Sequence, residues 1–329
     1  MAAGFDVAVI GAGVIGAAVA WEAARAGAAV CVIDAGARVP PATNAAAGML
    51  APSFEAVGGA DGAALYRLGA ASLQAWADFA GALQEETGRD LDYRPHGILG
   101  VAYSAEDAAA MRAAHDRLRA LGAKVALLDG DEASAREPGV ARPVLALHAP
   151  DDAQIDPRRT LAALQVALRR RRVRMIDGRA VALAPAGAVM SATLEDGTRI
   201  EAERVVLAAG SAAKRLDPSA PLVTVKGEAL ALSAPAQAAG RQINACVRAP
   251  GAYLCPRADG RLIVGATEIP NDDSLDVDGD RVDALRRRAH AAAPGLASWR
   301  EETRWAGLRP GTADGAPILG PDPIGAPAL

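Results

Sequence analysis

Residues 1–34 contain the feature that most constrains the fold. A β-branched run at 7–10 leads directly into the sequence Gly-Ala-Gly-Val-Ile-Gly at 11–16. An apolar segment of helical character follows, and a second strand-like run at 29–33 ends on Asp34. Strand, glycine turn, helix, strand and acidic residue, in this order, are typical of a βαβ unit that binds a dinucleotide.

Each part of this pattern has a physical role. Gly11 allows the tight turn, Gly13 lets the backbone approach a pyrophosphate, and Gly16 lets the helix pack against the strand. The free N–H groups at the helix start favour phosphate. Asp34 follows Gly16 by the spacing expected for the acid that binds an adenosine ribose, which disfavours the 2′-phosphate of an NADP-type cofactor. A glycine motif by itself also occurs in ordinary turns, and the strands, helix and acid in register distinguish this one.

Composition excludes several classes of protein. The chain has 329 residues, 51% hydrophobic residues and a formal net charge of −4, which gives no electrostatic basis for nucleic-acid binding. Three cysteines without close pairing fit a reducing compartment. No basic residue precedes Arg25, and the uncharged run 7–21 is short for a membrane span. We expect a cytoplasmic protein that does not enter a membrane.

The catalytic motifs of hydrolases and zinc enzymes do not occur. The four histidines lie far apart without metal-ligand spacing, and there is no Gly-x-Ser-x-Gly sequence: His96, His115, His148 and His290. A bound dinucleotide would then supply the difficult chemistry, with the protein providing binding and orientation.

Two segments are candidates for ligand contact. The uncharged segment 39–52 is either an alanine-rich loop or a surface whose small side chains let backbone approach a flat ligand. In the segment 305–320, Arg309 lies among glycines and prolines, which predicts a rigid, turn-rich loop. A guanidinium in a stiff frame suits bidentate binding of a carboxylate, although the same pattern also fits an ordinary surface arginine.

Five segments together resemble the FAD-dependent amine oxidases of the D-amino-acid oxidase superfamily, and among them the glycine oxidases of thiamine thiazole biosynthesis. They cover nearly the whole chain in order: 11–16 with Asp34, 43–52, 225–228, the strands around Tyr253 and 265–267, and 305–320. The segments 43–52 and 305–320 are specific to this group, whereas the first glycine motif is not.

The resemblance implies FAD held without a covalent bond. It assigns the pyrophosphate to Val14 and Ile15, the adenosine ribose to Asp34 and Ala35, and the adenine to the backbone at Val181. It assigns the flavin to a set of small residues and one methionine, namely Ala42, Thr43, Ala47, Gly48 and Met49. Arg309 corresponds to the residue that pairs with the substrate carboxylate. Tyr253 corresponds to a tyrosine of the same pocket, although a strand tyrosine can also be purely structural.

The resemblance also implies an α/β fold with two domains. Helical periodicity over 62–86 and after Asp156, followed by strand-like runs at 229–232, 252–254 and 262–264, agrees with this division. We expect a Rossmann-like FAD-binding domain formed by residues 1–85, 150–220 and 300–329. We expect a second α+β substrate domain, built on a mostly antiparallel sheet, from residues 86–149 and 221–299.

The implied reaction is oxidative deamination of glycine, sarcosine or a small D-amino acid such as D-alanine by FAD and O2, giving a 2-oxo acid, ammonia or an amine, and hydrogen peroxide. Residues near Glu268 and Tyr253 would shape the choice of substrate, and the sequence leaves that choice and a homo-oligomer open. Family members continue with another strand, a Gly-His-x-Arg-Asn-Gly loop and a final helix, which we expect this chain to lack. The alternatives are an NAD-dependent dehydrogenase and an inactive, truncated FAD-binding remnant.

Overall fold

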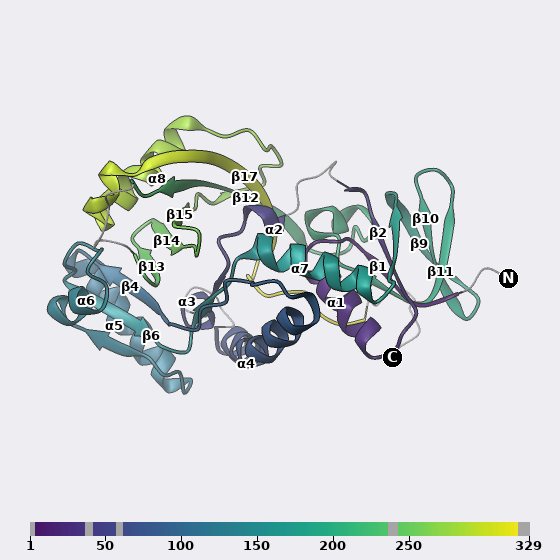
Figure 1. Cartoon of the computed structure of the whole chain (residues 1–329), viewed down its shortest axis with the longest axis horizontal. Coiled ribbons are helices and arrows are strands. Elements are labelled where there is room, and N and C mark those ends of the chain that lie inside the picture. Colours follow the sequence, from purple (N-terminus) through teal and green to yellow (C-terminus); the bar gives the residue numbers. More distant parts are fainter. Residues whose placement is uncertain (1–3, 37–41, 57–61, 236–242, 322–329) are drawn as a thin grey trace.

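The computed structural model describes residues 4–36, 42–56, 62–235 and 243–321. These residues form two large sheets and a two-stranded one, with a set of helices between and around them (Figure 1). The first half of the chain contains β1 (Phe5–Ile10), α1 (Val14–Arg25), β2 (Val30–Asp34), α2 (Ala42–Ala45), β3 (Met49–Leu50), α3 (Pro52–Glu55), α4 (Gly62–Thr87), β4 (Ile98–Ala102), α5 (Ala105–Ala120), β5 (Ala126–Leu128), α6 (Gly130–Arg136), β6 (Leu145–Ala149), β7 (Ala153–Gln154) and α7 (Pro157–Arg170).

The second half is richer in strands. It contains β8 (Arg174–Asp177), β9 (Ala180–Ala186), β10 (Val189–Leu194), β11 (Arg199–Leu207), η2 (Gly210–Arg215), β12 (Leu222–Ser233), β13 (Cys246–Ala249), β14 (Ala252–Pro256), β15 (Arg261–Gly265), β16 (Ile269–Pro270), α8 (Gly279–Ala292), η3 (Pro294–Ser298) and β17 (Arg300–Thr312).

The first sheet has six strands in the order β8-β2-β1-β11-β10-β9. β1 lies parallel to β2 and β11, and an antiparallel extension is formed by β9 and β10. β1 is apolar at successive positions because both of its faces are covered, as is usual for parallel strands. Val9 packs against α1 and α7 on one face, and Ile10 packs against strand residues on the other. The expected Rossmann-like unit is confirmed.

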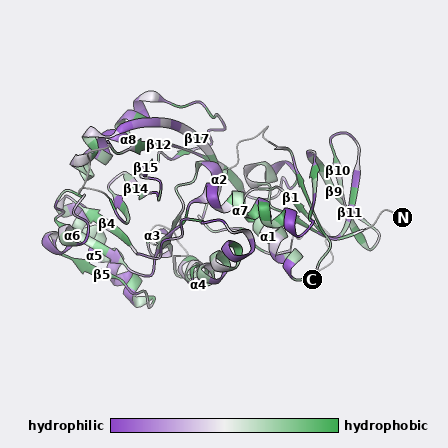
Figure 2. Ribbon diagram, viewed as in Figure 1, coloured by the Kyte–Doolittle hydropathy of each residue, from purple (hydrophilic) through white to green (hydrophobic). Residues whose placement is uncertain are grey.

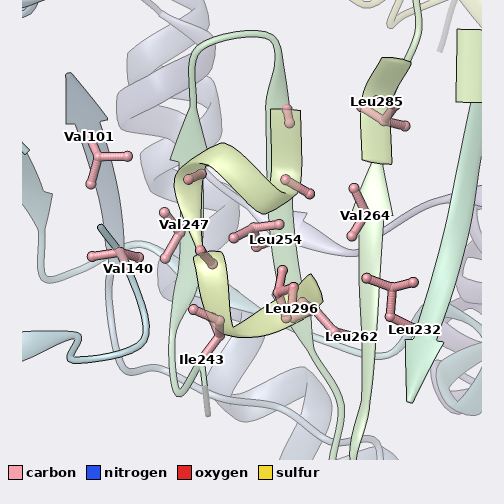
Figure 3. Packing of buried hydrophobic residues seen from close by; sticks show 14 of the residues in the cluster. Val101, Val140, Leu232, Ile243, Val247, Leu254, Leu262, Val264, Leu285 and Leu296 are labelled. Carbon is pink, nitrogen blue, oxygen red and sulfur yellow. The ribbon is translucent and has the colours of Figure 1, made fainter. Parts of the chain in front are cut away.

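The second sheet has nine strands, with β16-β12-β15-β14-β13-β4-β6-β5 as its path and β17 paired to β12. All of its pairs are antiparallel except β13 with β4. α8 and η3 cover one face, where Val247, Leu254 and Leu285 meet in a fully buried cluster (Figure 3). The mostly antiparallel second sheet is therefore also confirmed.

Helix starts follow their capping signals. The Ser104 hydroxyl accepts a hydrogen bond from the Asp107 N–H (3.0 Å) at the start of α5. The Asp156 carboxylate accepts from the Arg158 and Arg159 N–H groups at the start of α7, and Pro157 occupies the first helical position. These interactions satisfy backbone donors that have no partner inside the helix, and the start of the helix predicted after Asp156 is confirmed.

The environment of Arg309 differs from the prediction. Arg309 does not lie in a turn-rich loop, because β17 continues without interruption to Thr312 and pairs with β12 along its length. Pro310 is tolerated there because β17 has β12 as its partner on one side, and an edge strand can accept a residue without an N–H group. In Figure 2, β17 is coloured mainly hydrophilic, as expected for a strand at an edge. The two glycines and the proline of β17 are typical of turns, so the sequence did not predict this strand.

This strand also changes the proposed division of the chain. Residues 300–312 belong to the second sheet, which differs from the expected place of 300–329 in the FAD-binding domain. Residues 322–329 lie outside the described part of the chain. The other boundaries stay a proposal.

No helix among the described residues is long and apolar enough to cross a membrane. The same part of the chain holds no group of three or more histidine, cysteine, aspartate or glutamate side chains arranged to bind a metal ion.

Candidate functional site

The glycine turn between β1 and α1 is tightly enclosed by backbone. Gly11 has a φ of +106°, and a Cβ there would overlap the carbonyl oxygen of Ala208. A Cβ on Gly16 would overlap the carbonyl oxygen of Gly11. At Gly13, by contrast, the nearest atom to such a Cβ would be the Thr43 hydroxyl at 3.6 Å. Two of the three glycines are therefore required by packing, and the third leaves backbone accessible.

Asp34 ties the end of β2 to this turn. One carboxylate oxygen accepts from the Ala12 N–H (2.7 Å), and the other accepts from the Gly36 N–H (2.8 Å). The Asp34 carbonyl oxygen accepts from the Gly178 N–H (2.9 Å). Val181 lies three residues further along and is exposed on β9. The structure therefore brings the predicted ribose and adenine positions to the same end of the first sheet.

The start of α1 meets the small-residue segment. The Val14 N–H donates to the Thr43 hydroxyl (3.0 Å), and Thr43 lies on α2 between Ala42 and Asn44. Ile15, in the same turn of α1, is 66% exposed, which is unusual for an isoleucine beside a buried core. This geometry places the predicted pyrophosphate and flavin residues next to one another.

Backbone pairing with residues 154–155 and a buried arginine hold the segment that follows α2 in place. Gly48 has a φ of +79°, and its carbonyl oxygen accepts from the Ile155 N–H (2.9 Å). Met49 pairs with Gln154 where β3 meets β7. The buried Arg257 donates to the carbonyl oxygen of Ala47. The sequence did not predict this contact of Arg257, although its position directly after a strand and before the Asp-Gly turn at 259–260 is a signal that could have indicated it.

The second sheet approaches this segment through β17. The Trp305 indole N–H donates to the Ala45 carbonyl oxygen (3.1 Å). A Cβ on Gly307 would overlap the Cβ of Ala45, so the absence of a side chain allows this contact. Ala47, Tyr253 and Trp305 belong to one hydrophobic cluster. The small-residue segment thus packs on the face of the sheet that carries the predicted substrate residues.

Arg309 and Tyr253 lie near each other on that face. Burial raises the pKa of the Tyr253 hydroxyl, and the positive charge of Arg309 acts on that pKa in the opposite direction. The Tyr253 ring lies over Gly265 of β15, where a Cβ would overlap it. Arg309 forms an ion pair with Glu268 (Nη2 to Oε1, 2.8 Å). The sequence predicts that residues near Glu268 shape the choice of substrate, but it does not predict the ion pair between Glu268 and Arg309.

A glycine turn that fits a pyrophosphate therefore lies beside a segment of small residues. The protonated Tyr253 hydroxyl and the Arg309 guanidinium lie on the sheet face against which that segment packs. A hydroxyl donor and a guanidinium fork suit a carboxylate. This arrangement is typical of an oxidoreductase that binds a dinucleotide cofactor.

Comparison with known proteins agrees with this class. Residues 6–327 match the family model described as FAD dependent oxidoreductase (DAO). The chain is 35% identical to the bifunctional protein ThiO/ThiG of Synechocystis sp. over 97% of its own length, and it spans 47% of that relative. It is 31% identical to a glycine oxidase of Bacillus licheniformis, covering 97% of this chain and 85% of that protein. The crystal structure of glycine oxidase from Geobacillus kaustophilus superposes with a TM-score of 0.89, at 29% identity over 97% of this chain and 86% of the other.

The chain therefore belongs to the FAD-dependent oxidoreductases of the DAO family, in the group of amino acid oxidases that includes the glycine oxidases. The expected cofactor, FAD, is confirmed, and the alternative of an NAD-dependent dehydrogenase is wrong. The glycines that packing requires at the turn fit this cofactor.

A buried carboxyl group lies beneath the small-residue segment. Asp152 precedes β7 and is 1% exposed. One oxygen accepts from the Ser53 hydroxyl (2.8 Å), and the other has no partner among the described residues. Burial raises the pKa of Asp152 to about 7, and the hydrogen bond from Ser53 only partly opposes this effect. The folded protein therefore binds a proton that the unfolded chain releases near pH 4.

Asp152→Asn is expected to change how stability depends on pH. Because the pKa is raised on folding, Asp152 stabilises the folded state below its unfolded pKa, and this contribution is lost as pH rises towards 7. The variant should gain stability relative to the parent by about 2 to 4 kcal/mol between pH 4 and 7.5. Urea denaturation across this range measures it, with Asp116→Asn, an exposed site on α5, as the control. A constant difference across the range would refute the shifted pKa.

Proposed function

We propose that the chain catalyses FAD-dependent oxidative deamination of glycine or a small amino acid or secondary amine. The products are the 2-oxo acid, ammonia or an amine, and hydrogen peroxide. The observation that carries the proposal is that Arg309 and Tyr253 lie on the same face of the second sheet, the face against which the small-residue segment packs. The same face would thereby bind the substrate carboxylate and support the flat flavin ring.

The proposed cofactor contacts follow the chain. The start of α1 would hold the pyrophosphate with its free N–H groups and its dipole. Asp34 accepts a hydrogen bond from the glycine turn, and it would also bind the adenosine ribose. The full proposed set is Gly11, Gly13, Val14, Ile15, Gly16, Asp34, Ala35, Ala42, Thr43, Ala47, Gly48, Met49 and Val181.

On the substrate side, Arg309 would bind the amino acid carboxylate through two parallel hydrogen bonds. The Tyr253 hydroxyl is protonated at neutral pH and would donate a further hydrogen bond to that carboxylate. When bound, FAD would supply the two-electron acceptor for the substrate Cα–H bond, with O2 as the final oxidant. The residues contribute by orienting the Cα–H bond, and water hydrolyses the released imine.

The substrate proposal rests on the relatives. The most similar ones named for an activity are glycine oxidases, and the two-part relatives are named ThiO/ThiG. We propose glycine, with sarcosine and D-alanine as further substrates, and a role in forming the thiazole of thiamine. A solved iminodiacetate oxidase of Chelativorans at 26% identity has the same fold (TM-score 0.83), so substrates within this fold vary.

A substrate panel tests this proposal. The purified chain, loaded with FAD, is given glycine, sarcosine, D-alanine, L-alanine and L-proline, and peroxide release and O2 uptake are measured together. We expect one peroxide per O2 and the highest kcat/KM with glycine or sarcosine. Tight FAD binding without turnover of any amine would instead favour the alternative of an inactive FAD-binding remnant.

A further inference from the structure

Arg309, the residue proposed to bind the substrate carboxylate, already forms an ion pair with a carboxylate of the protein. Arg309 is paired with Glu268 at 2.8 Å, and their side chains are 58% and 69% exposed. A substrate carboxylate that accepts from the Nη2 N–H bound by Glu268 would displace the Glu268 carboxylate. The exposure of both side chains makes such an exchange feasible, because an exposed ion pair contributes little stability.

The backbone brings these two residues together across β12. Arg309 of β17 lies opposite Val225 on one side of that strand. On the other side, Ile269 lies opposite Lys226, and this register carries Glu268 to Gly227. Residues directly opposite each other share a face, as do positions 225 and 227. Arg309 and Glu268 therefore flank β12 on one face.

The backbone at Glu268 is anchored through its neighbour Thr267, whereas the exposed side chain of Glu268 has room to change its rotamer. The Glu228 N–H donates to the Thr267 hydroxyl (2.8 Å), and the Thr267 N–H donates to the Glu228 carbonyl oxygen (3.2 Å). The Thr267 hydroxyl also donates to the Glu228 carboxylate (3.1 Å), which is fully buried. The backbone before Glu268 is thus anchored to the sheet, so a displaced Glu268 carboxylate would stay close to the pocket.

We propose that Glu268 determines the specificity of this site, a statement that rests on the proposed function. In the free enzyme its carboxylate neutralises Arg309. When a substrate carboxylate takes that place, Glu268 turns a negative charge towards the remainder of the substrate. Its charge therefore favours amines with one carboxylate and disfavours amines with two, such as iminodiacetate or D-aspartate, because like charges at short range repel.

Glu268→Gln tests the proposal in the full FAD-loaded chain. The variant keeps the size of the side chain and removes its charge. The ratio of kcat/KM for iminodiacetate to that for glycine should rise about tenfold, and KM for glycine should fall about two- to fivefold with kcat unchanged. Glu268→Asp should return the ratio towards the parent value. Asp131→Asn breaks an ion pair of the same 2.8 Å length with Arg142 on an exposed surface and should leave every parameter unchanged.

A binding measurement separates this proposal from the proposed function. Calorimetry gives the Kd of acetate and of malonate, which need no turnover, for the parent and for Glu268→Gln. We expect the Kd of malonate to fall about tenfold in the variant and that of acetate to fall less. If no amine is oxidised but malonate binding improves in this way, the specificity proposal stands and the proposed function fails. If amines are oxidised but neither ratio changes, Glu268 does not determine specificity.

Discussion

Arg309→Ala is expected to lower kcat/KM for glycine about 100-fold while FAD binding survives. Truncating one partner of a charged, hydrogen-bonded pair typically costs a few kcal/mol, and the partial exposure of Arg309 keeps the effect at the lower end of that range. Because the carboxylate is held in the ground state as well as in the transition state, most of the loss should appear in KM. Steady-state peroxide release and a flavin titration measure the two properties separately.

Two further variants interpret this result. Arg309→Lys keeps the charge but loses the planar fork, so it should recover only part of the lost kcat/KM. Arg142→Ala removes an exposed arginine that pairs with Asp131 and should have no effect. Loss of FAD together with substrate binding in Arg309→Ala would mean that Arg309 supports the fold of β17 rather than the substrate.

Gly16→Ala is expected to have the second large effect, on cofactor binding. The added Cβ would overlap the carbonyl oxygen of Gly11, and that oxygen belongs to the turn that must hold the pyrophosphate. Backbone cannot yield as a flexible side chain can, so α1 must move away from β1. We expect FAD affinity to fall at least 100-fold and stability to fall by about 1 to 3 kcal/mol.

The matched control is another helical glycine. Gly81 lies within α4, and a Cβ there would meet no atom within 4 Å. Gly81→Ala should stabilise the chain by about 0.5 to 1 kcal/mol, because alanine has the higher helix propensity. FAD affinity, measured by fluorescence titration, should be unchanged in this variant. Equal FAD binding by Gly16→Ala and the parent would contradict the assigned role of the turn.

The first sheet was predictable because local signals and tertiary contacts agree there. The run 7–10, the glycines at 11–16 and the acid at 34 each satisfy a local rule, and all of them require the same βαβ unit. The start of α7 followed from its capping residue for the same reason. Where local sequence signals and tertiary packing favour the same structure, the sequence alone predicts that structure.

The substrate side was harder to predict because its geometry depends on pairing between distant strands. Glycine and proline around Arg309 indicated a turn, and only the long register with β12 makes that segment a strand. The Arg309–Glu268 ion pair joins residues 41 positions apart and depends on how two other strands pair with β12. No local pattern contains that information. The assignment of individual residues to FAD and substrate stays a prediction.

Anaerobic reduction of the bound flavin tests the central claim most directly. The FAD-loaded chain is mixed with glycine or sarcosine in the absence of O2, and the absorbance of oxidised flavin is followed for the parent and for Arg309→Ala. We expect the parent's flavin to be bleached and the variant to need about 100-fold more substrate for the same rate. Admitting O2 should restore the absorbance, with one peroxide formed per flavin. A parent flavin that stays oxidised with glycine, sarcosine and D-alanine would contradict the central claim.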